Sequence, residues 1–167
     1  MAQISSTLTQ QVIGYLNAVH QVCQSAAGNA QPEIMSSESL VLRYGRSFSQ
    51  RVRTQVRGMK GKCFQTCYDW ILENDSLTYC EGYAICNGLV LPVLHAWLVC
   101  EQGQVHDPTW KLGNNAYFGV ELERKFVLDT VAQTKSYGII SSDFRLDFSL
   151  HRNGFPAHAL ARQFHQS

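Results

Sequence analysis

The spacing of the apolar residues changes from a helical repeat to a two-residue alternation, and this change limits the fold more than any other feature. Residues 62–74 carry apolar side chains at helical spacing, whereas residues 79–86 and 93–100 have the period of β-strands. Residues 101–104 have the composition of a hairpin turn, and residues 105–110 form a third strand-like segment that Pro108 interrupts. The pattern predicts a helix beside antiparallel strands, which is the α+β class.

A single domain is expected for residues 1–167, because a domain commonly has roughly 100–200 residues. Apolar side chains recur at helical spacing over residues 4–27 and predict an N-terminal helix. A loop over 28–39 and a short strand over 40–44 follow. After a further short strand, a helix that ends before Gly138 begins the C-terminal helical extension.

Charge and composition exclude several classes of protein. The formal net charge is +1, and charged residues make up only 16% of the chain, so neither nucleic-acid binding nor disorder is expected. The longest apolar stretch, 89–100, is too short to cross a membrane, and the N-terminus lacks the features of a signal peptide. Six cysteines without a secretion signal are expected to be reduced thiols in a cytoplasmic protein.

Residues 43–62 form a basic segment that holds half of the chain's 14 basic residues and no acidic residue. One interpretation is a solvated loop. The other is a positive rim, with Arg51, Arg53 and Arg57 at its centre, that attracts an acidic partner or lowers the pKa of a nearby thiol.

Cys63 has the surroundings that a thiol nucleophile needs. It lies in the first turn of the predicted helix, where the helix dipole stabilises a thiolate, and Lys60, Lys62 and Arg57 are close in sequence. Cys67 falls one turn further along the same helix face and is expected to pack in the core.

His95 and Asp107 are the candidate base and the residue that orients it. A two-residue turn between their strands would place the two side chains on opposite faces of the hairpin. A three-residue turn, with Gly103 in the left-handed conformation, places Asp107 diagonally across from His95 on one face. A catalytic triad with Cys63 therefore requires the odd-length turn.

Four short motifs in a fixed order resemble those of the transglutaminase-like superfamily of cysteine enzymes. They are GKC at 61–63, EGYA at 81–84, HAW at 95–97 and DPTW at 107–110. Together with YFGV at 117–120 they also look like a small uncharacterised bacterial and phage group. The resemblance covers about residues 40–120 and implies a papain-like core, in which the helix bearing the cysteine packs on an antiparallel sheet bearing the histidine and aspartate. It further implies Cys63 as nucleophile, His95 as general base and acid, and Asp107 as the residue that orients His95.

Further residues are candidates for binding substrate or stabilising an oxyanion. The resemblance suggests an upstream side chain for the oxyanion hole, and Gln55 and Gln50 lie upstream of Cys63. Glu81 is either a second acid in the cleft or a hydrogen-bonding strand residue. Trp97 and Trp110 flank the histidine and aspartate and are expected to wall the site and exclude water.

Three functions are consistent with these residues. The first is a cofactor-free enzyme that hydrolyses a protein or peptide-like amide through a Cys63 thioester, and the short chain favours water as the acceptor. The second is transglutaminase- or deamidase-type transfer. The third is a non-catalytic binding module that uses the basic segment. A zinc site built from the cysteines and His95 is a weaker alternative, because no C-x2-C pair is present and alternate strand positions face opposite ways.

Overall fold

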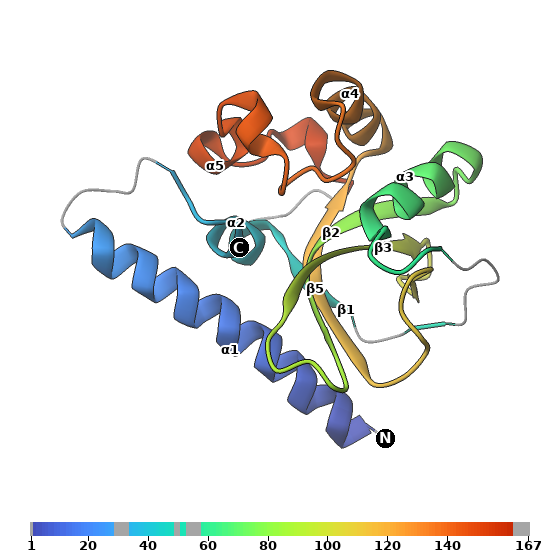
Figure 1. Cartoon of the computed structure of the whole chain (residues 1–167), viewed down its shortest axis with the longest axis horizontal. Helices are drawn as coiled ribbons and strands as arrows, with labels where there is room; N and C mark the ends of the chain where they lie inside the picture. Colours follow the sequence, from blue (N-terminus) through green and yellow to red (C-terminus); the bar gives the residue numbers. More distant parts are fainter. Residues whose placement is uncertain (1, 29–33, 49–50, 53–57, 162–167) are drawn as a thin grey trace.

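A computed structural model describes residues 2–28, 34–48, 51–52 and 58–161 of the chain (Figure 1). It contains one antiparallel sheet with the strand order β1-β5-β2-β3-β4. The α+β class expected from the sequence is confirmed. The strands are β1 (Arg46–Phe48), β2 (Leu77–Cys86), β3 (Val93–Cys100), β4 (Val105–His106) and β5 (Asn115–Leu122).

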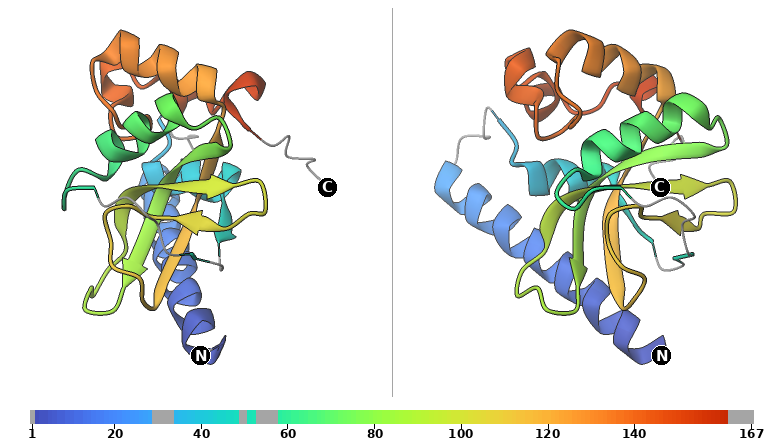
Figure 2. Two further views of the ribbon diagram at one scale, coloured as in Figure 1. Left: turned by 90° about the vertical axis from the view of Figure 1, so that its right-hand side faces the viewer. Right: turned by 45° about the vertical axis from the view of Figure 1, so that its right-hand side comes forward.

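Helices precede, interrupt and follow the strands along the chain. Figure 1 shows α1 as a long helix along one side of the molecule and α4 and α5 together at the top of the view. The turned views of Figure 2 also show α1 well separated from these two C-terminal helices. The α-helices are α1 (Ala2–Ala27), α2 (Ser37–Tyr44), α3 (Cys63–Glu73), α4 (Arg124–Thr134) and α5 (Ser149–Asn153), with 3-10 turns η1 (Asp143–Leu146) and η2 (Ala157–Ala159).

Three of the predicted segments differ from the structure. The loop predicted over 28–39 is too long, because Ser37 already begins α2. Residues 40–44 belong to α2 and not to a strand, because the Ser36 hydroxyl accepts a hydrogen bond from the Ser39 N–H and starts a helix there. The strand expected over 105–110 ends at His106, where Asp107 turns the chain and Pro108 has no N–H to donate. The helix of 62–74 and the strand of 93–100 are confirmed.

The two faces of the sheet pack against different layers. One face, which includes Tyr79, Ala96 and Val120, joins the core formed with α1, α2 and α3. The other face carries a smaller aromatic cluster that includes Phe48, Trp97 and Tyr117. Neighbouring side chains of β3 therefore point to opposite faces of the sheet. Ala96 faces the helices, and His95 lies on the face of the aromatic cluster.

A pair of glycines lets β2 and β5 approach closely, and Gly119 leaves room for Trp97 on the aromatic face. Gly82 pairs with Gly119 across β2 and β5, and Gly82 also pairs with His95 across β2 and β3. A Cβ atom at Gly119 would lie 2.5 Å from Cη2 of Trp97 and 2.6 Å from the carbonyl oxygen of Glu81. Gly119 thus allows the indole to lie directly against the sheet, on the face that also carries the histidine.

Replacing Gly119→Ala is expected to lower the free energy of unfolding by about 1–3 kcal/mol, because the new methyl group overlaps the indole and a backbone carbonyl. Gly113→Ala is the matched control, since no atom lies within 4 Å of a Cβ there. Urea unfolding of both variants measures the difference. Equal stability of the two variants would show that the close packing of Trp97 is unimportant.

Candidate active site

The three-residue turn that a triad requires is present between β3 and β4. Leu98 pairs with His106 and Val99 with Val105, so residues 101–103 form the turn. Gly103 has a φ of +77°, and its N–H donates to the Cys100 carbonyl oxygen at 2.8 Å. This prediction from the hairpin sequence is confirmed, and it brings Asp107 to the same face as His95.

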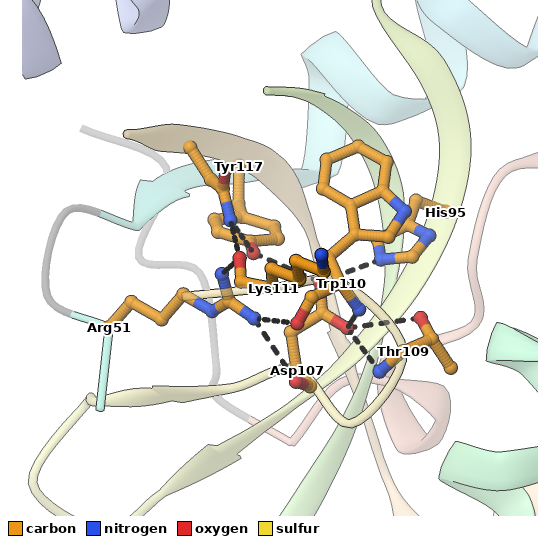
Figure 3. Close-up of polar contacts among 8 residues, drawn as sticks. Arg51, His95, Asp107, Thr109, Trp110, Lys111 and Tyr117 are labelled. Carbon is orange, nitrogen blue, oxygen red and sulfur yellow. Dashed lines mark hydrogen bonds and ion pairs between the residues drawn. The ribbon is translucent and has the colours of Figure 1, made fainter. Parts of the chain in front are cut away.

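His95 and Asp107 form a buried pair (Figure 3). Nε2 of His95 lies 2.9 Å from Oδ2 of Asp107, and the two residues are 3% and 0% exposed. Oδ1 of Asp107 accepts the backbone N–H groups of Thr109 at 2.9 Å and Trp110 at 3.1 Å, and the Thr109 hydroxyl at 3.1 Å. The carboxylate is therefore held in place by the turn that follows it.

Tyr117 is a member of the site that the sequence did not identify. Its hydroxyl donates to Oδ2 of Asp107 at 2.9 Å, and the Asn115 side-chain amide lies 3.2 Å from the same hydroxyl. Tyr117 is on β5, which is separated from β3 by β2 in the sheet. The YFGV motif drew attention to the segment, but only the strand order places its tyrosine beside the carboxylate.

Cys63 is the first residue of α3, and His95 interacts with its sulfur. Burial opposes ionisation of the thiol, but the hydrogen bond and charge of His95, together with the backbone N–H groups of Ala96 and Phe64, outweigh it and lower the pKa of Cys63. Cys67, one turn later, is fully buried, and burial raises its pKa well above the ordinary thiol value. Of these two thiols on one helix face, Cys63 is the more easily ionised and Cys67 the less easily ionised.

The imidazole is held in its charged form. Burial disfavours the imidazolium, but the hydrogen bonds to Asp107 and Cys63 outweigh burial and raise the pKa of His95 to about 9. Burial likewise opposes ionisation of Asp107, yet the hydrogen bond to His95 and the N–H groups of its turn hold the pKa of that carboxyl far below its usual range. Because Nε2 is bound to Asp107, Nδ1 is the ring nitrogen left to face the thiol.

The two tryptophans have different roles. The Trp110 ring stacks on His95 with centroids 4.2 Å apart and an interplanar angle of 21°, so it walls the site as expected. Trp97 is 0% exposed, and its centroid lies 6.4 Å from that of His95. The hypothesis that Trp97 touches substrate is wrong, because the indole is enclosed between Gly119 and its aromatic neighbours Phe48 and Tyr117.

Glu81 is a structural carboxylate. It is 0% exposed and accepts the N–H groups of Ile139 at 2.6 Å, Ile140 at 3.0 Å and Ser141 at 3.1 Å, together with the Tyr79 hydroxyl. Burial raises its pKa to about 7, against the opposing effect of these hydrogen bonds. Of the two interpretations of Glu81, the hydrogen-bonding strand residue is confirmed and the acid in the cleft is wrong.

Arg51 holds the turn that contains Asp107. Its guanidinium donates to the backbone carbonyl oxygens of Asp107 at 3.2 Å, Trp110 and Lys111. The guanidinium is thus bound to the protein itself and does not form a free cationic rim. The other members of the expected rim, Arg53 and Arg57, and the oxyanion candidates Gln55 and Gln50 lie outside the described residues.

Comparison with known proteins adds no relative: no family model matches the chain, and no curated protein or solved structure is significantly similar to it. Within the described part of the chain, no group of three or more His, Cys, Asp or Glu side chains is placed to hold a metal ion. No helix among these residues is long and apolar enough to span a membrane.

The His95–Asp107 pair is expected to make stability depend on pH. A histidine pKa raised to about 9 contributes stability that is complete below about pH 6.5 and is lost as the pH rises through about 9. The difference in free energy of unfolding between the wild type and Asp107→Asn should shrink over that window. Urea unfolding at several pH values measures it, with Tyr117→Phe as a control that keeps the charged pair. A difference that does not change with pH would contradict the raised pKa.

Proposed function

We propose that the protein is a cysteine-dependent acyl-transfer enzyme that hydrolyses a protein or peptide-like amide through a thioester on Cys63. The observation that carries the proposal is the chain of contacts from Cys63 through His95 to Asp107. It unites a thiol of lowered pKa, a charged imidazole and a buried carboxylate. This is the arrangement that nucleophilic catalysis by cysteine needs.

Each residue has a defined part in the reaction. The Cys63 thiolate attacks the carbonyl carbon of the amide, and the imidazolium of His95 delivers a proton to the leaving amine as the C–N bond breaks. His95, now neutral, takes a proton from water as the water attacks the thioester. The acid is then released and Cys63 returns to the thiolate. Asp107 holds the ring orientation and stabilises the imidazolium throughout.

The N-terminus of α3 supports stabilisation of the oxyanion. Lys62 precedes the helix, and its side chain makes no capping hydrogen bond to the first turn. Because Cys63 is the first residue of α3, its backbone N–H has no partner within the helix and can face a developing negative charge, which the helix dipole also favours. A second donor from Gln55 remains a prediction based on the resemblance.

The order of the elements supports the resemblance to transglutaminase-like enzymes with a papain-like core. α3 carries the cysteine and packs on β2 and β3, and an antiparallel hairpin brings the histidine and aspartate together. The size of the chain favours water over an amine as the acyl acceptor. The alternative binding module gains no support from Arg51, whose guanidinium is bound to backbone carbonyls of the Asp107 turn.

Selective alkylation of Cys63 tests the proposal. Iodoacetamide at about pH 6 should label Cys63 well before the other five thiols, because the hydrogen bond and charge of His95 lower the pKa of its thiol. His95→Gln should remove this selectivity, since the hydrogen bond and the positive charge that stabilise the thiolate are lost. Peptide mass mapping identifies the labelled residue.

Cys100→Ser is the matched control, because Cys100 is a half-buried thiol on β3 outside the site, and its replacement should leave the labelling of Cys63 unchanged. The proposal fails if Cys63 reacts no faster than the other thiols, or if its reaction is the same in His95→Gln. Thermal unfolding of each variant verifies that it is folded under the labelling conditions.

A further inference from the structure

A second chain of hydrogen bonds joins a hydroxyl, an imidazole and a carboxylate away from Cys63. The Oγ atom of Ser37 lies 3.0 Å from Nε2 of His151, and Nδ1 of His151 lies 2.7 Å from Oδ2 of Asp143. We propose that Ser37 is the nucleophile of a second acyl-transfer site, whose substrate is a small carboxylic ester with a short apolar acyl group. The site involves α2, η1 and α5 and shares no residue with the thiol site.

Asp143 and His151 are held in fixed positions. Asp143 is 0% exposed, and it accepts the backbone N–H groups of Leu150 at 3.1 Å and His151 at 3.0 Å, as well as the Ser149 hydroxyl. The carbonyl oxygen of His151 accepts the Met35 N–H at 2.8 Å. In the tautomer that donates Nδ1–H to the carboxylate, Nε2 of His151 faces Ser37 as an acceptor, which is what a general base requires.

Backbone donors lie beside the Ser37 hydroxyl. Ser37 is the first residue of α2, and Ser36 is the cap that accepts the Ser39 N–H through its side chain and the Leu40 N–H through its carbonyl. None of the hydrogen bonds among the described residues uses the N–H of Ser37 or of Glu38. These two groups at a helix N-terminus can stabilise the oxyanion that forms when Ser37 attacks a carbonyl carbon.

Exposed apolar side chains next to the hydrogen-bond relay of Ser37, His151 and Asp143 indicate the kind of acyl group that the site would accept. Phe148 is 38% exposed, and its ring centroid lies 6.0 Å from that of His151 at an interplanar angle of 85°. Ile34, also 38% exposed, precedes the residue whose N–H binds His151. Ser37 itself is half-buried. A short apolar acyl chain can contact both side chains, whereas a large substrate would have less access to the hydroxyl.

The reaction balances without a cofactor. The Ser37 oxygen forms a bond to the acyl carbon, its proton passes to Nε2 of His151, and the bond to the alkoxy oxygen breaks. His151 then gives that proton to the departing alcohol. Water then gives a proton to His151 as its oxygen bonds to the acyl carbon, and His151 passes that proton to the departing Ser37 oxygen, which releases the carboxylic acid and restores the hydroxyl.

A fluorophosphonate probe tests this site in the full-length Cys63→Ala protein, where the proposed thiol nucleophile is absent. The serine oxygen forms a bond to phosphorus as fluoride leaves, and peptide mass mapping locates the adduct. We expect the adduct on Ser37, with labelling slowed about 100-fold in His151→Gln. An excess of a short-chain ester should also slow the labelling.

A neighbouring serine–histidine pair provides the control. Nδ1 of His20 lies 2.8 Å from Oγ of Ser39, which is 8% exposed, so His20→Gln should leave the labelling of Ser37 unchanged. Thermal unfolding of His151→Gln establishes whether it is folded, and labelling of the Cys63→Ala protein unfolded in urea gives the rate without the relay. The proposal is overturned if folded Cys63→Ala protein shows no adduct on Ser37, or labels no faster than the urea-unfolded protein. Because Cys63 is absent, either result leaves the proposal for the thiol site unaffected.

Discussion

The buried hydrogen bond between His95 and Asp107 is the interaction on which the rest of the candidate site depends. It requires that two side chains from different strands meet on one face, and the three-residue turn at 101–103 provides that register. A hairpin one residue shorter would place Asp107 on the opposite face from His95. The raised pKa of His95, and through it the lowered pKa of the Cys63 thiol, follows from this pairing.

Burying this pair has a cost that several neighbours offset. A carboxylate removed from water is stable only when its lone pairs are satisfied, and Asp107 receives hydrogen bonds from Thr109, Trp110, Tyr117 and His95. The backbone of the same turn is held by Arg51. The stacked Trp110 ring covers the imidazole and keeps water away from it, which strengthens the electrostatic interaction. The residues that hold the His95–Asp107 pair in position therefore also shield it from water.

The second histidine–aspartate pair uses similar chemistry in a different structural setting. Asp143 accepts N–H groups at the start of α5, whereas Asp107 accepts those of an irregular turn. His151 binds Ser37 of α2 through its ring, and its carbonyl oxygen binds the N–H of Met35, which precedes α2. In both places the carboxylate oxygens accept hydrogen bonds from nearby backbone N–H groups and one more from the imidazole. Backbone N–H groups of a turn or of a helix start can thus fix a carboxylate, which in turn orients a histidine.

Several elements and part of the short-range geometry could be predicted from the sequence. Helical spacing predicted α3, alternation predicted β2 and β3, and Gly103 favoured the three-residue turn that lets His95 and Asp107 meet, because these features depend on residues close in the chain. The burial of Trp97, the place of Glu81 in the core, and the contact of Tyr117 with Asp107 were decided only by the tertiary structure. They depend on the strand order β5-β2-β3 and on which layer packs against each face of the sheet. The spacing of residues along the chain predicts neither.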